Sequence, residues 1–469
     1  MATLLLFSTL QPMSALAADK RSLQDESIYD LLVDRFFNGN FSNDEDVDVK
    51  DMQAFSGGDF AGIVKKADYL EGLGLTLASI GPVFETATYD GNEVLSYGAF
   101  EPHFGTEDEF IEMIKVLKKK DIGTVVDFPL NGISGQHEWI QDQSLASVKG
   151  EKGAVQWDAQ DETVQETLKK TIVEFAGKYD LAGIRFTHLG DFDEAFLNDV
   201  ISEVKVKNSD LYVFTNETST AKFDTMVDAQ KFEALNQSFV EIDPDSAALN
   251  LFEDQNEGAL IQLDDLTGTR ITDDMVRLKM FPPTRWKIGL TALFTLPGIP
   301  VLPYQSEIAV TGKQAPESHP ITNFKTDTEL YDHIADLNTL RNKSDTLRNG
   351  DFELLHNENG FTVYTRKSDE ETWVIALNNT SKTMDLEIDE ATIGENKKLR
   401  GVLGQELVRQ DKDGKYRVVL ERELAEVYIA DEDTGYNTPY LIITIVIYSS
   451  FFILLFMMIR RSKKNKAEK

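Results

Sequence analysis

Between residues 24 and 345 the chain alternates short apolar runs with longer stretches in which apolar residues recur every three or four positions. A short apolar run is typical of a buried strand, and the longer spacing predicts a helix with one apolar face. The predicted strands lie at 28–33, 75–80, 123–127, 183–186, 211–215, 259–263 and 299–302. About eight alternating strand–helix units over this length predict a TIM-type (β/α)8 barrel.

Three of the predicted helices have the clearest patterns. Thr106 and Glu109 have the spacing of a capping box, so a helix should begin directly after Thr106. Apolar residues of one face recur at Phe110, Ile114 and Leu117 in this helix, at Val164, Leu168 and Ile172 in the second, and at Leu330, Ile334 and Leu337 in the third. Each set predicts a helix that packs one side against a sheet.

From about residue 346 the pattern changes to short alternating segments separated by turn signals. Predicted strands lie at 352–355, 361–366, 372–377, 384–388 and 416–420. Asn359-Gly360 and Asp413-Gly414 are typical of two-residue hairpin turns. The pattern predicts a small antiparallel β domain over 346–431, followed by a polar linker over 432–439.

The two ends of the chain have the patterns of a membrane-anchored surface protein. Residues 1–18 contain an apolar run and then a small-x-small site, which predicts a secretory signal peptide. Residues 440–459 carry no charge, and a helix of that length spans the ~30 Å apolar core of a bilayer. The basic residues of 460–469 predict a cytoplasmic tail, which places the body outside the cell.

The composition narrows the classes of function. The formal net charge is −33, and phosphate binding needs clustered Lys and Arg, so a nucleic-acid partner is not expected. The chain has no Cys, which excludes disulfides, thiolate zinc sites and Cys nucleophiles. The absence of Cys also agrees with a Gram-positive-type cell surface.

Several segments, in order along the chain, resemble motifs of the α-amylase family, glycoside hydrolase family 13. They are GGDFAGI at 57–63, PHFGT at 102–106, LPGIP at 296–300 and RNGDF at 348–352. The resemblance covers about residues 25–430 and implies a (β/α)8 barrel followed by a β domain. It also implies a retaining reaction, in which a carboxylate nucleophile and a carboxylic acid lie ~5 Å apart. A third carboxylate distorts the sugar.

The resemblance places some of the family's site residues in this chain. Asp127 and Asn131 match the motif after the third barrel strand, and Arg185 matches the motif of the fourth. Glu217 stands at the acid/base position after the fifth strand, and Asp265 stands in the motif of the seventh. The resemblance therefore implies catalytic-site roles for Asp127, Arg185 and Glu217, and substrate contacts for Asn131 and Asp265.

Four other site positions have changed. The nucleophile position holds Thr187, and the position of the sugar-distorting carboxylate holds Thr267. Gly132 and Leu266 replace the two companion histidines. A threonine hydroxyl is a weak nucleophile without an adjacent base. One of the three catalytic carboxylates is therefore kept, which predicts a catalytically degenerate site.

Two further features bear on this prediction. Asp191, Asp264 and Asp265 lie near the changed positions, so a displaced carboxylate could restore a catalytic pair. In the family, a long excursion after the third strand forms domain B, one wall of the cleft. Here only about 25 residues separate Asn131 from Trp157, which predicts a reduced domain B and a cleft that excludes water poorly.

The resemblance also implies a structural calcium site near the start of the barrel. Amide and carboxylate oxygens with a backbone carbonyl suit a hard cation. The expected ligands are the side chains of Asn38, Asn40, Asn43, Asp44 and Asp59 and the carbonyl of Gly57. The alternative is an ordinary Asn/Gly-rich turn.

The sequence thus supports three functional hypotheses. The first is a membrane-anchored, catalytically degenerate α-amylase-family protein that binds α-glucan or oligosaccharide, or a membrane-protein partner. The second is an active retaining α-glucan hydrolase that uses a displaced carboxylate. The third is a purely structural envelope protein. Turnover of maltooligosaccharides separates the first two.

Overall fold

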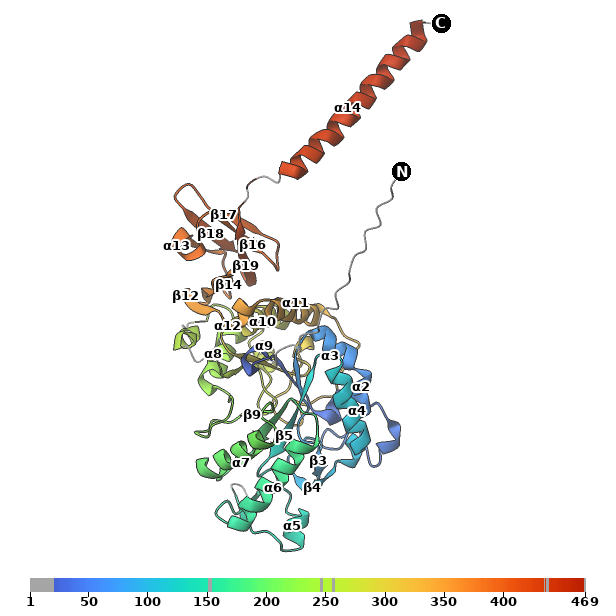
Figure 1. The fold of residues 1–469 in the computed structure, drawn as a ribbon, viewed down its shortest axis with the longest axis vertical. Coiled ribbons are helices and arrows are strands. Elements are labelled where there is room, and N and C mark those ends of the chain that lie inside the picture. Colours follow the sequence, from blue (N-terminus) through green and yellow to red (C-terminus); the bar gives the residue numbers. More distant parts are fainter. Residues whose placement is uncertain are drawn as a thin grey trace, which may run out of the picture. The chain divides into compact units, whose positions relative to one another are not determined.

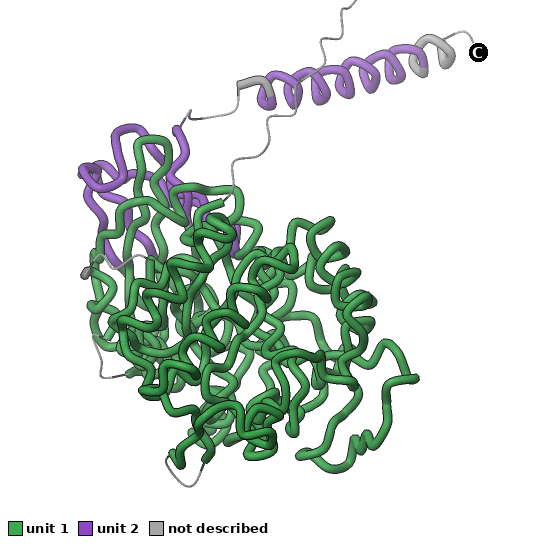
Figure 2. The backbone as a smooth tube through the Cα atoms, turned by 60° about the horizontal axis from the view of Figure 1, so that its bottom comes forward, with its two compact units in different colours: residues 1–385, 419–427 green, residues 386–418, 428–469 purple. Residues whose placement is uncertain are grey.

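The computed structural model describes residues 21–150, 154–244, 248–254, 258–433, 435 and 438–467. The predicted signal peptide lies outside the described residues, as do parts of the predicted linker and tail. The chain divides into two compact units, residues 1–385 with 419–427 and residues 386–418 with 428–469 (Figure 2). The boundary between them falls inside the predicted β domain.

The first unit contains a parallel sheet that confirms the predicted TIM-type barrel (Figure 1). Its strand order is β10-β11-β1-β2-β5-β8-β9, with bounds β1 Ile28–Asp30, β2 Leu77–Ser79, β5 Gly123–Pro129, β8 Gly183–Thr187, β9 Tyr212–Thr215, β10 Leu260–Gln262 and β11 Ile299–Pro303. Single parallel bridges join Thr215 to Met226 and Val227 to Leu260. Met226 and Val227 therefore stand between β9 and β10, at the position of the eighth strand of a (β/α)8 barrel.

Helices follow the strands, as the periodicity predicts. The capping box of Thr106 and Glu109 is formed, and α4 (Glu107–Lys118) begins directly after it. The predicted faces of α6 (Glu162–Lys178) and α11 (Glu329–Lys343) are buried. The other helices of this unit are α1 Val33–Phe36, α2 Phe60–Lys65, α3 Ala67–Leu73, α5 Glu138–Gln141, α7 Glu194–Lys207, α8 Ala229–Val240, α9 Ile271–Arg277, α10 Pro282–Thr295 and α12 Asp345–Asn349.

The excursion after β5 is small. It holds α5 and a two-stranded hairpin, β6 (Ser147–Lys149) and β7 (Val155–Trp157). The rings of His137, Trp139 and Trp157 pack together there with Tyr97 of β4 (Val94–Phe100), which pairs with β3 (Phe84–Thr86). Aromatic packing therefore supplies the core that this short segment could not otherwise build.

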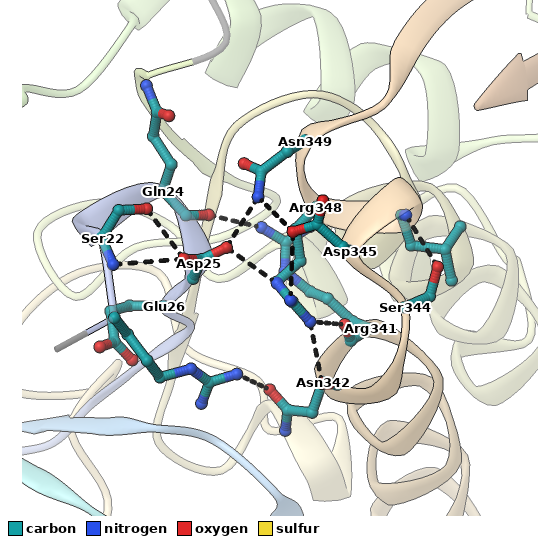
Figure 3. A network of polar contacts seen from close by, with 12 residues as sticks. Ser22, Gln24, Asp25, Glu26, Arg341, Asn342, Ser344, Asp345, Arg348 and Asn349 are labelled. Carbon is teal, nitrogen blue, oxygen red and sulfur yellow. Dashed lines mark hydrogen bonds and ion pairs between the residues drawn. The ribbon is translucent and has the colours of Figure 1, made fainter. Parts of the chain in front are cut away.

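An ion-pair network ties the start of the described chain to the end of the barrel (Figure 3). The Asp25 carboxylate accepts from Arg348 Nε at 2.9 Å and from Asn349 Nδ2 at 2.8 Å. Arg348 Nη1 also donates to the carbonyl oxygens of Arg341 and Asn342. Residues before β1 are thus held against α11 and α12.

Antiparallel strands follow the barrel, as predicted. In the first unit, β12 (Asp351–Glu358), β13 (Phe361–Lys367) and β14 (Thr372–Asn378) pair in sequence. Asn359 and Gly360 both have positive φ, which the hairpin turn between β12 and β13 requires. The remaining elements are β15 Met384–Asp389, α13 Glu390–Ile393, β16 Lys397–Gly401, β17 Leu407–Arg409, β18 Lys415–Leu420 and β19 Leu424–Glu432.

The last helix, α14 (Thr438–Ala467), contains the predicted apolar segment. Its window Tyr440–Arg461 has a mean hydropathy of 2.6, and none of that window is buried. By length and composition, this helix is able to cross a membrane.

Candidate functional site

A cavity of about 390 Å³ opens at the carboxyl ends of the barrel strands. This is the end at which TIM barrels carry their active sites, because the loops that follow the strands converge there. Of the predicted site residues, Asp127, Arg185, Thr187, Glu217, Asp265, Leu266 and Thr267 line this cavity. A second cavity of about 560 Å³ includes Asn131 and Gly132 in its lining. The structure thus places every residue transferred from the catalytic motifs at one end of the barrel.

Arg185 lines the cavity and forms ion pairs with two carboxylates. Its guanidinium donates to Asp30 at 2.8 and 2.9 Å and to Asp127 at 2.7 and 2.6 Å. Burial disfavours the charged form, but the two carboxylates outweigh burial and raise the pKa of Arg185. All three side chains are buried. Asp30 and Asp127 are therefore ion-paired groups that position Arg185 and are not available as bases.

Two threonines, Thr187 and Thr267, stand at positions where the resemblance implies carboxylates. Thr187 ends β8 at the cavity and is 7% exposed. Thr267 lies in a turn in which its backbone N–H donates to Asp265 Oδ1 at 2.8 Å. Among the described residues, neither hydroxyl has a carboxylate or imidazole partner that would activate it as a nucleophile.

The three acids that could form a carboxylate pair with Glu217, namely Asp191, Asp264 and Asp265, have different surroundings. Asp264 is buried against Arg270, with Nε 2.5 Å from its Oδ2, and its other oxygen accepts from the Ile271 N–H. Asp191 is exposed and is not among the residues that line the cavity. Asp265 does line the cavity, and its Oδ1 also accepts from the Gly268 N–H. Asp265 is therefore the one of the three that could pair with Glu217.

Glu217, which the resemblance places at the acid/base position, lines both cavities. Its Oε1 accepts from the Leu189 N–H at 3.2 Å, and its own N–H donates to Thr215 Oγ1. The loop after β8 thus orients the carboxylate through a backbone donor.

Asn131, for which the resemblance implies a substrate contact, lines the larger cavity and also forms hydrogen bonds within the protein. Its Oδ1 accepts from the Trp157 N–H at 3.0 Å, and its Nδ2 donates to the Leu189 carbonyl at 3.3 Å. Both ends of the amide are used within the protein. Asn131 therefore ties the end of β5 to β7 and to the loop after β8.

Several residues that line the cavities have no counterpart in the sequence prediction, among them two histidines and an asparagine. His188 and Asn92 line both cavities, and His319 lines the first. His319 Nε2 donates to the Leu266 carbonyl and Nδ1 accepts from Tyr89 at 3.0 Å. Burial lowers the pKa of His319, so it is neutral at pH 7. These residues lie on loops far apart in the chain, and no local motif marks them.

The predicted calcium ligands divide into two groups. Asn38 Nδ2 donates to both Asp44 oxygens, at 3.0 and 2.9 Å. A Cβ on Gly57 would lie 2.5 Å from Asn38 Nδ2 and 2.8 Å from Asp44 Oδ1, so these three residues are adjacent. The Oδ1 atoms of Asn38 and Asn43 are buried without a hydrogen-bond partner. Orphaned amide oxygens beside a carboxylate fit a hard cation.

The other two expected ligands are used elsewhere. The Asp59 oxygens accept from the N–H groups of Gly39, Asn40 and Gly62, which makes Asp59 the N-cap of α2. Asn40 Oδ1 accepts from Ser42. Within the described residues no cluster of three or more acidic or His side chains could hold a metal ion, so a cation here would depend on amide and carbonyl oxygens.

Comparison with known families finds two matches in this chain. A model described as "Alpha amylase, catalytic domain" matches residues 30–171. A model described as "Alpha-amylase C-terminal domain" matches residues 350–428.

Two solved structures resemble the chain over nearly its whole length. The α-amylase of Anoxybacillus has a TM-score of 0.85 and 32% identity, and the match covers 89% of this chain and all of that one. The α-amylase of Geobacillus thermoleovorans, solved in complex with acarbose, has a TM-score of 0.83 and 30% identity over 88% of this chain and all of that one.

Relatives of known activity are more distant in sequence. The β/α-amylase of Paenibacillus polymyxa is 24% identical over 76% of this chain, which spans about a third of that protein's length. The maltogenic α-amylase of Bacillus acidopullulyticus is 22% identical over 77% of this chain and 71% of that protein.

Proposed function

Because this chain belongs to the α-amylase family of glycoside hydrolases, we propose that the cleft at the end of its barrel takes α-glucans. The support is the placement of Arg185, Glu217 and Asp265 in one cavity at the carboxyl ends of the strands. Known relatives whose structures hold acarbose or maltotriose support the same ligand class. The related enzymes are named for action on maltose-type glucans, so an α-glucan is the substrate class with the most support.

Within this class, we propose binding without retaining hydrolysis. The observation that carries this proposal is the pair Thr187 and Thr267, which hold no activated hydroxyl at the two positions where the family needs carboxylates. Without a nucleophile, the covalent glycosyl intermediate of a retaining enzyme cannot form. In this proposal the cleft binds a glucan without cleaving it. The bound glucan is then presented to a partner protein or kept at the cell surface.

Hydrolysis is the second candidate, and two observations favour it. Asp265 and Glu217 line the same cavity, and two solved α-amylases are 32% and 30% identical to this chain. In this scheme Glu217 would protonate the leaving oxygen, and Asp265 would act as nucleophile or activate a water, according to the distance between the two carboxyl groups.

One experiment on the full-length protein in mild detergent separates the two. We expect maltopentaose to bind with micromolar to millimolar affinity by calorimetry, while reducing-sugar release stays at background. Reducing-sugar release that disappears in Glu217→Gln would establish the second candidate. Asp191→Asn is the matched control, because that exposed carboxylate lies outside the cavity.

We also propose that α14 anchors the protein in the cell membrane, with the basic end of the helix in the cytoplasm and the barrel outside. The support is its apolar, unburied surface and the Arg and Lys residues that follow. The same full-length preparation checks this proposal before detergent is added: membranes washed in alkaline carbonate should retain the protein. Release into the wash would contradict a spanning helix. A glucan-binding domain held at the surface could also serve a membrane-protein partner.

We propose that Asn38, Asn43, Asp44 and the Gly57 carbonyl hold a structural calcium ion. Calcium would satisfy the orphaned Oδ1 atoms and tie the loop over 38–44 to Gly57. A bound ion stabilises the folded state by about 2.7 kcal/mol when its concentration is a hundredfold above Kd. We expect EDTA to lower Tm by several degrees, measured by calorimetry with and without added calcium.

Asp44→Ala should remove this EDTA effect. Asp59→Ala should lower Tm equally with and without calcium, because it removes a helix cap. Asp48→Ala, in the neighbouring acidic loop, is the control and should leave the EDTA effect intact. A natural protein whose Tm does not respond to EDTA would refute the site.

A further inference from the structure

We infer that the imidazole of His188 is a sugar-binding group of this cleft, and that Gly132 is glycine because its missing side chain makes room for that ring. This inference rests on the proposed function, since it names how the same cleft holds its glucan. It concerns a residue that no motif of the resemblance includes. Four observations carry it.

First, His188 lies where the two cavities at the end of the barrel meet. The larger is lined by the excursion after β5, and the other by the strand ends. Asn92, His188 and Glu217 are the three residues that line both. A glucan that extends from one cavity into the other would therefore pass the ring of His188 and the carboxylate of Glu217 together.

Second, the backbone at His188 has an uncommon conformation. Its φ is +52°, in the left-handed region that only a few per cent of non-glycine residues adopt, Asn, Asp and His more often than the others. Such a conformation persists when the surrounding contacts hold it, and strain of this kind concentrates at functional sites. Leu189, the residue after His188, is held in two ways. Its carbonyl accepts from the Asn131 side chain, and its N–H donates to the Glu217 carboxylate. On the other side, the Leu130 N–H donates to the Thr187 carbonyl at 2.8 Å, so the backbone is held both before and after His188.

Third, Gly132 is what admits the ring. β5 and β8 pair in parallel with Pro129 opposite Thr187, so the segments that leave these strands run side by side. A Cβ on Gly132 would lie 3.1 Å from Cδ2 of His188, closer than carbon atoms normally approach. The same Cβ would lie 3.2 Å from Pro129 Cβ and 3.3 Å from the Asn92 carbonyl oxygen, so any other residue at 132 would crowd the ring, which is the most movable of the three neighbours.

Fourth, the hydrogen bonds leave an acceptor atom on each of two residues that line both cavities. His188 Nε2 lies 2.8 Å from Asn92 Oδ1, and an amide oxygen only accepts, so Nε2 carries the proton. In the neutral ring, Nδ1 is then an acceptor. The Oε1 atom of Glu217 accepts from the Leu189 N–H, which leaves Oε2 as a second acceptor. Two acceptors at one place suit the neighbouring hydroxyl donors of a pyranose ring.

The test measures maltopentaose binding and Tm in the full-length protein. His188→Gly removes the ring and also relieves the left-handed strain. We expect Kd to rise about tenfold, the size of one lost hydrogen bond, while Tm stays equal or increases. His356→Gly, an imidazole on β12, is the control and should leave Kd unchanged. A role confined to stability would instead lower Tm and leave Kd unchanged, which would overturn the inference.

A double-mutant cycle tests the part played by Gly132. Gly132→Ala should weaken binding in the natural protein, because its methyl group displaces the ring. In the His188→Gly background the same substitution should change Kd less than twofold. Equal, additive effects in both backgrounds would overturn the role of Gly132.

The outcomes also separate this inference from the function on which it rests. If the natural protein binds no maltopentaose, the proposed function fails, and this inference fails with it. If the natural protein binds and His188→Gly binds equally well, the inference alone fails.

Discussion

Replacing Thr187 and Thr267 together by aspartate should give this protein hydrolytic activity on maltooligosaccharides. Thr187 stands at the end of β8 and faces the same cavity as Glu217. An aspartate there would supply the nucleophile that a retaining reaction requires, and Glu217 would serve as acid and base. Nucleophiles of this kind change rates by several orders of magnitude, so we expect a rise of ~10³-fold or more in reducing-sugar release.

The matched control replaces both threonines by asparagine, which has the shape of aspartate without its charge. This variant should stay at background, and adding Glu217→Gln to the aspartate variant should abolish its activity. Hydrolysis by the natural protein at a rate close to that of the double variant would contradict the binding proposal. It would instead favour Asp265 as the second carboxylate.

Arg185→Met should destabilise the barrel by about 3–5 kcal/mol, the cost of leaving buried carboxylates without their partner. Asp30 and Asp127 both direct their oxygens at this guanidinium, and all three side chains are buried. Removing the cation leaves two like charges facing each other in a site with little water. The shift in the denaturant midpoint of the first unit measures the loss.

Two comparisons make this prediction specific. Adding Asp30→Asn and Asp127→Asn to Arg185→Met should recover much of the stability, because no unpaired charge remains. Arg277→Met breaks an exposed pair with Asp274 and should shift the denaturant midpoint far less than Arg185→Met, because solvent screens exposed charges. A small effect of Arg185→Met alone would show that the carboxylates do not depend on the arginine.

The barrel was predictable because parallel strands buried on both faces are nearly continuous apolar runs. The seven predicted strands of the barrel are all present. The segment at 226–227 was not predicted, because it joins its neighbours through single bridges and is too short to have a pattern. In the β domain, β16, β17 and β19 were missed because charged residues interrupt their apolar positions.

The site was predictable only where a residue stands at the end of a strand. Asp127, Arg185 and Glu217 follow apolar strands, so their position at one end of the barrel follows from the topology. Asp264 and Asp265 show the limit: they are adjacent in sequence, yet one is buried against Arg270 and the other lines the cavity. Which of two neighbouring acids faces a cleft depends on tertiary packing.

The two hydrogen bonds of Asn131 set a lower limit on how far the excursion after β5 can shrink. The Asn131 amide oxygen accepts from the N–H of Trp157 at the end of β7, and the amide nitrogen donates to the Leu189 carbonyl. Further shortening that removed β7 would release the amide, and with it the loop that orients Glu217. The hairpin is therefore linked through Asn131 and Leu189 to the carboxylate of Glu217, so its length affects the cavity as well as the barrel.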